Sequence, residues 1–211
     1  MLDGDENKNG HCQMTETVSE PEVLRPIHLS YRKYYLRTLT SSDVSEKYLR
    51  WVRDPEVTKY LDIKNNRYDN IDVLYDYVNT FENVNNKFLF GVFDNKDNAH
   101  IGNASVYNIH YRNGTFDIGY LIGEKEYWGK NASVELLVML LKFSFDDLKL
   151  RKFFGGLYAN HLQSRFVLRR MGFVQEACLK DYLMFEGKPV DRIIYSLDKY
   201  QWAQIRKKFS V

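Results

Sequence analysis

The stretch "FDIGYLIGEKEYWGKNASVELLVMLLKFSF", residues 116–145, begins as a predicted strand and ends as a long apolar helix. Apolar side chains in this helix recur at intervals of three and four residues, which predicts a stripe that packs the helix against a sheet. A further strand is predicted over 153–158, so the order strand–helix–strand indicates a β-α-β unit at the centre of the fold. The stripe consists of Val134, Leu137, Val138, Leu141, Phe145 and Leu148.

The turn before the helix, Trp128–Ser133, is built mainly from small residues. A helix start exposes unpaired backbone N–H groups and the positive end of the helix dipole. Gly129, Ala132 and Ser133 leave these donors uncovered, which suits a diphosphate that approaches the backbone closely. The alternative is a plain tight turn in which Asn131 takes a left-handed conformation. Neither G-x-x-x-x-G-K-[ST] nor G-x-G-x-x-G occurs, which disfavours nucleotide hydrolysis and dinucleotide redox chemistry.

The strand before the turn carries a carboxylate next to a glycine. Side chains alternate between the two faces of a strand. This alternation puts Phe116, Ile118, Tyr120 and Ile122 on one face and Asp117, Gly119 and Leu121 on the other. Asp117 is therefore a candidate base beside backbone that a ligand can approach. The alternative is an ordinary exposed carboxylate.

The remaining pattern mixes helices and strands without internal repeats. The dipeptide Asn113-Gly114 predicts a hairpin turn, and Ser41–Asp43 is expected to cap the first helix. Together the segments predict an α+β fold around one mixed, mostly antiparallel sheet flanked by helices. Strands are expected at 34–39, 88–93, 99–111, 116–123, 153–158, 173–185 and 191–197, and helices at 44–52, 55–61, 70–84, 132–148, 161–171 and near Trp202.

Composition is that of an ordinary globular protein: 211 residues, 44% hydrophobic and 27% charged, with a net charge of +2. Residues 1–26 are polar and acidic, and we expect a flexible tail or an expression remnant there, followed by one domain over 27–211. Apolar runs are too short for a membrane helix, and basic residues form no nucleic-acid footprint. Cys12 and Cys178 suggest no disulfide framework and fit a reducing cytoplasm.

Three segments carry a family resemblance. Trp128-Gly129-Lys130 is similar to the W-G-K-G-x-A/G loop, with Asn131 at the usual glycine and Ser133 at the final small residue. Residues 51–57 resemble a W-x-N/R-D-P-x-V segment, and residues 164–173 an S-x-x-V-L-E-K-x-G-F helix. The chain thus resembles the GCN5-related N-acetyltransferase (GNAT) superfamily, in its branch of ribosomal-protein and amino-sugar acetyltransferases, over about residues 34 to 205.

The resemblance implies acetyl-coenzyme A as co-substrate and no metal. It assigns the coenzyme to Leu121, Ile122, Trp128, Gly129, Lys130, Asn131, Ala132, Ser133, Val134, Asn160 and Ser164. It implies Asp117 as the general base, with Ser164 or Tyr158 as proton donor to the thiolate; Tyr182 is a further candidate donor. Some relatives place a glutamate nineteen residues after the serine, but this chain has Leu183 there. Asn160 has the alternative role of a helix cap.

The expected function is an N-acetyltransferase that acts on a primary amine of a small molecule, such as an amino sugar or a nucleotide-linked amino sugar. Two alternatives stay open: acetylation of protein N-termini, and a degenerate module that binds coenzyme A without turnover. A serine hydrolase is disfavoured because no G-x-S-x-G elbow occurs, and the five histidines lack metal-ligand spacing. A small-molecule partner is expected, with no nucleic acid and no membrane, and a homodimer is compatible with such a fold.

Overall fold

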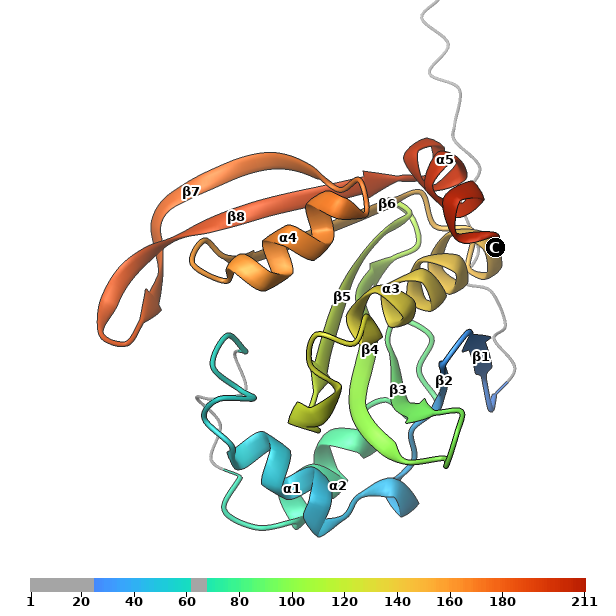
Figure 1. Ribbon diagram of the computed structural model, residues 1–211, viewed down its shortest axis with the longest axis vertical. Helices are drawn as coiled ribbons and strands as arrows, with labels where there is room; N and C mark the ends of the chain where they lie inside the picture. The colour runs from blue at the N-terminus through green and yellow to red at the C-terminus, as the bar shows by residue number, and fades with distance from the viewer. Residues whose placement is uncertain (1–24, 62–67) are drawn as a thin grey trace, which may run out of the picture.

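The computed structural model describes residues 25–61 and 68–211. Within these residues one sheet has the order β1-β2-β3-β4-β5-β6-β8-β7 (Figure 1). All neighbours are antiparallel except β5 and β6, which are parallel, so the predicted α+β fold is confirmed. The strands are β1 (His28–Tyr31), β2 (Tyr34–Thr38), β3 (Phe88–Asp94), β4 (His100–His110), β5 (Thr115–Ile122), β6 (Lys152–Tyr158), β7 (Val174–Phe185) and β8 (Lys188–Asp198).

Helices cover both faces of the sheet. One core cluster contains residues of α3, α4 and α5, and a second contains residues of α1 and α2. Ile122 belongs to the first cluster and its neighbour Leu121 packs against the second, as the alternation of a strand requires. The helices are α1 (Glu46–Arg53), α2 (Asp72–Asn79), α3 (Ala132–Lys142), α4 (Leu162–Arg170) and α5 (Lys199–Phe209). None of the described helices is long and apolar enough to cross a membrane.

The parallel contact between β5 and β6 is very short. The two strands pair only at Thr115↔Lys152 and Phe116↔Phe153, and then spread apart (Figure 1). β6 continues to pair with β8 over its whole length, up to Tyr158↔Arg192. Beyond Phe116, the backbone of β5 therefore lacks a sheet partner on the side of β6. This opening carries the site described below.

The predicted helix over 55–61 is wrong. The Asp54 carboxylate accepts hydrogen bonds from the backbone of Glu56 and Val57, which forms a local turn, and the Thr58 N–H bonds the Asp54 carbonyl. The segment continues as turns because this first turn is not propagated. The predicted cap at Ser41–Asp43 is also wrong: these residues form a separate 3₁₀ turn, and Ser45 caps α1.

Other predicted elements have different bounds. The helix expected over 70–84 is the shorter α2, and the helix expected over 132–148 is α3 followed by a π-helical turn at Phe143–Asp147. Strand β1 was not predicted; it pairs with β2 at the edge of the sheet. The Asn113-Gly114 turn is confirmed, with a φ of 60° at Gly114. The expectations for the tail and for Cys12 concern residues 1–24, which lie outside the described residues.

The end of β5 is fixed by close contact between Gly123 and Trp51 of α1. A Cβ atom at Gly123 would lie 2.1 Å from the Trp51 indole, and the indole N–H donates to Glu124 over 3.1 Å. Gly123→Ala is therefore expected to lower the free energy of unfolding by about 1 to 3 kcal/mol through overpacking. Urea denaturation followed by circular dichroism measures this change.

The smaller Trp51→Leu background provides the control, because it removes the indole that the new methyl group meets. We expect the Gly123→Ala cost to shrink there, which gives a coupling energy between the two positions. An equal cost in both backgrounds would contradict the contact as the cause.

Candidate active site

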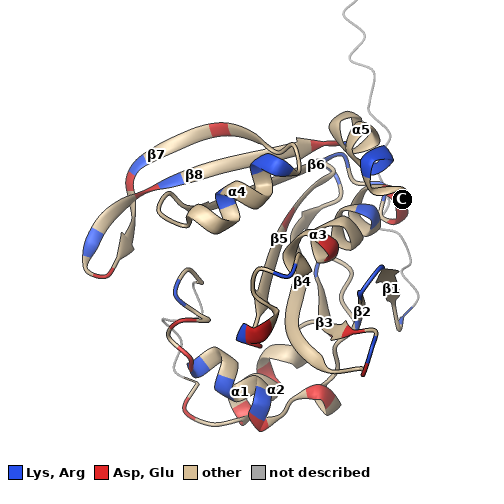
Figure 2. Cartoon of the chain, in the orientation of Figure 1, with Lys and Arg blue, Asp and Glu red and all other residues tan. Residues whose placement is uncertain are grey.

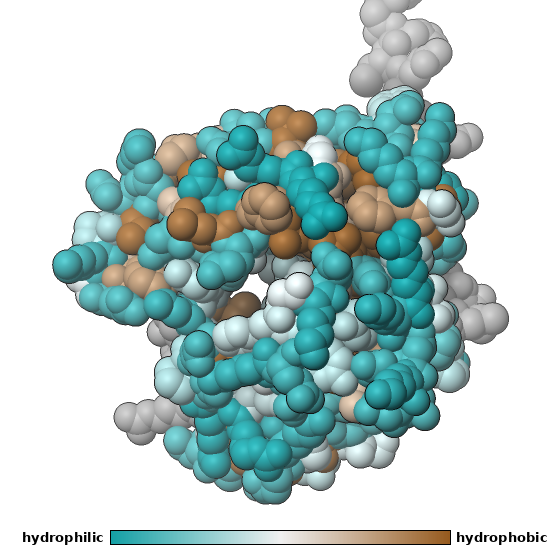
Figure 3. All heavy atoms as spheres, in the orientation of Figure 1, coloured by the Kyte–Doolittle hydropathy of each residue, from teal (hydrophilic) through white to brown (hydrophobic). Residues whose placement is uncertain are grey.

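A cleft of about 1200 Å³ lies where β5 and β6 diverge. It is lined by both strands, the turn before α3, α4, and the region of α1 and the following segment. Figure 3 shows the molecule hollowed between the part built around α4 and the part built around α1. The size is sufficient for an extended ligand that enters near α3 and ends near α1.

At one end of the cleft lies the turn before α3. Gly129 and Asn131 have φ angles of 76° and 64°, so the alternative left-handed conformation of Asn131 is present. A Cβ atom at Gly129 would meet nothing within 4 Å, which leaves its backbone open to a ligand. The Trp128 indole N–H donates to the Ile122 carbonyl over 2.8 Å and ties this turn to β5.

The turn presents backbone donors to the cleft. Among the residues that the structure describes, nothing accepts a hydrogen bond from the N–H groups of Gly129, Asn131, Ala132 and Ser133. The Val134 N–H bonds the Asn131 carbonyl, and Val134 lines the cleft. The Lys130 side chain lies over the Tyr127 ring at 5.4 Å, outside the lining. The turn thus combines a left-handed backbone with N–H groups that have no acceptor among the described residues, and this combination suits an anion.

The open edge of β5 adds further backbone groups. The Gly123 N–H bonds Ile101 of the strand β4, so by alternation the backbone groups of Ile122 and Tyr120 face the gap. Leu121 turns its backbone to β4 and lines the cleft with its side chain. The Ile122 carbonyl already accepts from Trp128, so an extended ligand with amide groups can replace the missing strand partner at Tyr120 and at the Ile122 N–H.

Asp117 lies in the wedge between the diverging strands. A Cβ atom at Gly155 of β6 would lie 2.3 Å from the Asp117 carboxylate, so only glycine leaves room for it. Burial raises the pKa of Asp117 to about 6, although the Ile118 N–H, Tyr107 and the charge of Arg192 each oppose this rise. A carboxyl group with this pKa is a much stronger base than an ordinary aspartate.

Ser164, at the start of α4, is held by His161. The Ser164 N–H donates to His161 Nδ1 over 3.2 Å, and Ser164 Oγ lies 3.2 Å from His161 Nε2. Burial lowers the pKa of His161 to about 4, so the ring is neutral near pH 7. Nδ1 accepts, and the single ring proton is therefore on Nε2, which donates to Ser164 Oγ. The Ser164 hydroxyl proton is then left to point elsewhere.

The helix cap predicted for Asn160 is absent, since His161 caps α4 with its ring nitrogen. Asn160 is not among the residues that line the cleft, and its carbonyl accepts from the Tyr60 hydroxyl over 3.3 Å. Tyr120, which was not predicted as a site residue, hydrogen-bonds with Ser133 and Ser164 and so connects α3 to α4. The only sequence signal was a hydroxyl on an otherwise apolar strand face.

Aromatic side chains surround the other end of the cleft. Tyr158 is buried and packs near Tyr60 and Phe185, with ring centroids 5.9 Å apart in each case. Leu183 lines the same region, so no carboxylate is supplied at that position. Further tyrosines in the lining are Tyr48, Tyr68, Tyr77 and Tyr107. This end is therefore polar and aromatic.

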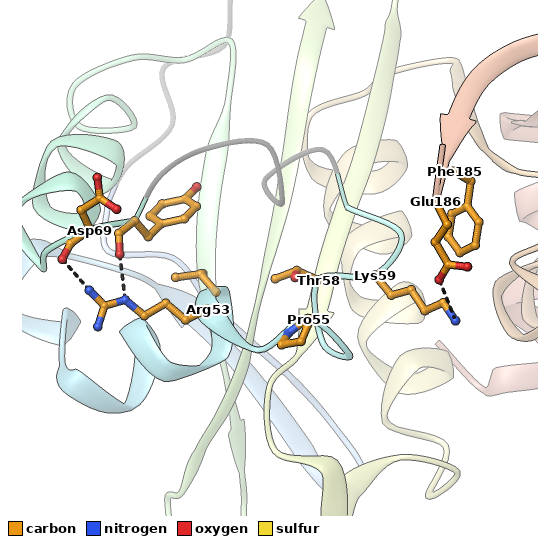
Figure 4. A pocket seen from close by; sticks show the side chains of 9 residues that line it. Arg53, Pro55, Thr58, Lys59, Asp69, Phe185 and Glu186 are labelled. Carbon is orange, nitrogen blue, oxygen red and sulfur yellow. Dashed lines mark hydrogen bonds and ion pairs between the residues drawn. The ribbon is translucent and has the colours of Figure 1, made fainter. Parts of the chain in front are cut away.

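An outer recess of about 640 Å³ adjoins the aromatic end (Figure 4). The Lys59 ammonium lies 3.7 Å from the Glu186 carboxylate and spans the recess, while Arg53 donates to the backbone carbonyls of Tyr68 and Asp69. Both cations therefore already have partners. Among the described residues, no group of three His, Cys, Asp or Glu side chains could hold a metal ion.

Residues 33–174 match the family model of the acetyltransferase (GNAT) domain. The chain belongs to the GNAT family of N-acetyltransferases. This membership confirms the predicted family and the predicted acyltransferase class. The resemblance assigned the coenzyme to the turn before α3, and that assignment stays a prediction.

Similar proteins agree with this membership. The chain is 29% identical over 187 residues to the N-acetyltransferase p20 of Bacillus licheniformis, with 86% of this chain and 99% of the relative covered. It is 28% identical over 129 residues to the [ribosomal protein uS5]-alanine N-acetyltransferase of Escherichia coli, with 60% and 65% covered.

Two solved structures have the same fold. A GCN5-related N-acetyltransferase from Brucella melitensis has a TM-score of 0.74 at 15% identity, covering 91% of this chain and 86% of that one. A spermidine N-acetyltransferase from Vibrio cholerae, in complex with CoA and spermine, has a TM-score of 0.73 at 20% identity, covering 81% and 98%.

The left-handed residue in the GNAT loop can be tested. Asn131→Val is expected to weaken coenzyme A binding by about 10-fold or more, because a β-branched residue resists this conformation and one charged hydrogen bond is lost. Titration calorimetry with coenzyme A measures the affinity. Asn131→Gly is the matched control, since glycine accepts the same φ and should bind nearly as well as the wild type. Equal affinities for all three proteins would contradict the assigned role of the turn.

Proposed function

We propose that this GNAT enzyme transfers the acetyl group of acetyl-coenzyme A to a primary amine of a small molecule by direct attack. The observation that best supports this proposal is the arrangement of the cleft. Backbone N–H groups without acceptors lie in the turn before α3, and Asp117, with a pKa of about 6, lies between β5 and β6. The diverging strands β5 and β6 connect the two ends.

The coenzyme fits the cleft residue by residue. The diphosphate is assigned to the N–H groups of Gly129, Asn131, Ala132 and Ser133, with Lys130 beside them. The amide groups of the pantetheine arm are assigned to the backbone of Tyr120 and to the N–H of Ile122, whose carbonyl is already bound by Trp128. The chemistry supplied by the bound coenzyme is an activated acetyl thioester. The remaining assigned contacts are the side chains of Leu121, Trp128, Val134 and Ser164, which line the cleft.

Asp117 is assigned as the general base. An aliphatic amine with a pKa near 10 is mostly protonated at neutral pH and must lose a proton before it attacks. Above pH 6 the Asp117 carboxylate is ionised and can take that proton directly or through one water molecule. Backbone N–H groups along the open edge of β5 are positioned to stabilise negative charge that develops on the acetyl oxygen.

Ser164 is assigned as the proton donor to the departing thiolate. Its Oγ accepts from His161 Nε2, which leaves the hydroxyl proton available for the cleft. Tyr120 interacts with Ser164 and so helps to position it, while burial raises the pKa of Tyr120 and keeps its hydroxyl protonated. Tyr158, the other predicted donor, packs in the aromatic group with Tyr60 and Phe185, so we assign it to the acceptor end.

The acceptor is proposed to be a small polar amine, with amino sugars as the leading class. Support comes from the aromatic and polar lining, because tyrosines recognise sugars through both ring faces and hydroxyl groups. A protein N-terminus is the second candidate. It is favoured by the similarity to the uS5-alanine acetyltransferase and by the outer recess, which leaves room for a peptide to leave the cleft.

A coenzyme-binding module without turnover is the third reading, and the buried base weighs against it. Burial raises the pKa of Asp117 and so costs stability near neutral pH, and groups with such shifted pKa values are concentrated at catalytic sites. The test is release of free thiol from acetyl-coenzyme A across a panel of amino sugars, peptide N-termini and polyamines. Saturable release supports the enzyme and identifies its acceptor class. Tight coenzyme binding with no release for any member would contradict the proposal.

Asp117→Asn is expected to slow acetyl transfer by about 10²- to 10⁴-fold and to leave coenzyme A affinity nearly unchanged. Single-turnover quench experiments measure the rate, and calorimetry measures the affinity. Asp117→Glu serves as the control that keeps the carboxylate. An unchanged rate in the Asn variant would rule out Asp117 as the base.

The same substitution is expected to raise the free energy of unfolding near neutral pH by about 1 to 3 kcal/mol, because the folded pKa exceeds the ordinary value by about two units. The sign follows from burial: the fold favours the protonated carboxyl, so the wild type loses stability as pH rises from about 4 through 6. Asparagine avoids this loss. Urea denaturation at pH 4 and above pH 7 checks that the difference appears only at the higher pH.

The pH profile gives an independent test. Below pH 6 the wild-type rate should lose an additional factor of about ten per pH unit, because Asp117 becomes protonated. The ratio of wild-type to Asp117→Asn rates isolates this group from titration of the acceptor amine. A ratio that stays constant between pH 5 and 8 would contradict the assignment.

A further inference from the structure

The acceptor end of the cleft contains an arginine that the family resemblance does not account for. Arg192 is in β8, opposite Tyr158 of β6, and lines the cleft. Its side chain lies against Gly156, where an added Cβ atom would be 2.4 Å from Arg192 Nε. The Tyr182 ring lies 5.5 Å from the guanidinium carbon. A glycine below and an aromatic ring beside it thus hold the guanidinium in a defined place.

Among the residues that the structure describes, no side-chain ion pair or side-chain hydrogen bond is formed by the Arg192 guanidinium, although its charge acts on Asp117. The adjacent Asp191 is occupied by the Lys180 ammonium at 2.8 Å and by the Asp181 N–H at 3.1 Å. Glu186, at the tip of the same hairpin, pairs with Lys59. Figure 2 shows the acidic and basic positions that adjoin on β8.

Asp117 and Arg192 both line the cleft, and Asp117 is close enough for the charge of Arg192 to act on it. Two other charged residues of the lining have partners: Glu56 is 2.6 Å from the Lys125 ammonium, and Lys59 pairs with Glu186. Arg170 of α4 is a further cation in the lining. Between β5 and β8 the cleft offers the Asp117 carboxylate as a base and the Arg192 guanidinium as a cation. A polyamine would find Arg192 repulsive and would find no second carboxylate.

We propose that Arg192 forms an oxyanion-binding subsite, and that the acceptor is an amine with a carboxylate or phosphate group a few bonds from its nitrogen. The inference rests on the proposed acetyl transfer and names its substrate class. A planar guanidinium binds either oxyanion through two parallel hydrogen bonds, which also orients the acceptor. Both Asp117 and Arg192 line the same cleft, so one small acceptor can place its amine at the base and its anion at the guanidinium.

The test compares matched acceptors that differ only in the oxyanion. Glycine is paired with glycinamide, and glucosamine 6-phosphate with glucosamine, and spermidine represents the polyamines. We expect kcat/KM to be higher for the anionic member of at least one pair by about 10- to 100-fold, the value of a charge-assisted hydrogen bond. The two pairs separate carboxylate from phosphate as the recognised group.

Arg192→Gln is expected to reduce this selectivity ratio to nearly one, mainly through KM of the anionic member. Arg192→Lys should keep part of the ratio, because the charge remains but the paired geometry is lost. Lys188→Gln is the matched control: it removes one positive charge from the same exposed hairpin, outside the cleft lining. Melting temperatures establish that each variant is folded.

Measuring the binding of the acceptors directly tests the subsite even if no acetyl transfer is observed. Calorimetric titration of each acceptor pair into coenzyme A-saturated protein should show tighter binding of one anionic member, and Arg192→Gln should abolish the difference. Equal binding of both members in both pairs, or a preference for spermidine, would overturn the subsite. A selectivity ratio that Arg192→Gln leaves intact would also overturn it. Absence of thiol release together with selective anion binding would instead contradict the proposed acetyl transfer.

Discussion

The early end of the β5–β6 ladder is the constraint on which the rest of this structure depends. Two parallel pairs, ending at Phe116 and Phe153, align the strands, and the next residue of β5 is the aspartate that fills the wedge. The core on the α3 face holds the strands at their joined end, where Phe116 and Phe153 pack together with ring centroids 5.9 Å apart. Beyond that point β6 follows β8, and β5 follows β4. The opening is therefore built into the pairing of the sheet.

Much of the fold could be predicted because its signals are local. The α3 stripe, the Asn113-Gly114 turn and the alternation of β5 each depend on residues near in sequence, and each is present. The prediction of a helix over 55–61 was wrong because the Asp54 carboxylate accepts hydrogen bonds from the backbone that follows it, and these bonds compete with helix propagation. The edge strand β1 was not predicted because its four residues show too little alternation to be distinguished from a loop.

The residues of the candidate site likewise fall into those that local sequence signals could predict and those that depend on the folded structure. The turn from Trp128 to Ser133 is continuous in sequence, and so its role as a candidate anion site could be predicted from the sequence alone. The roles of Tyr120 and Arg192 depend on contacts across the fold, since Ser164 and Gly156 belong to distant segments. The role of His161 also depends on the folded structure, because its two ring nitrogens contact both the backbone N–H and the hydroxyl of Ser164.

The hydrogen bond from the Trp128 indole to the Ile122 carbonyl ties the turn before α3 to the end of β5. Asp117 lies five residues before Ile122 on β5, a span of about 17 Å at 3.3 to 3.4 Å per residue. For the proposed acetyl transfer, the length of β5 therefore sets how far the arm of a donor must reach from the tied end of the strand to the assigned base. A donor with a much shorter arm would leave its acyl group short of Asp117, even if its anionic end bound the turn equally well.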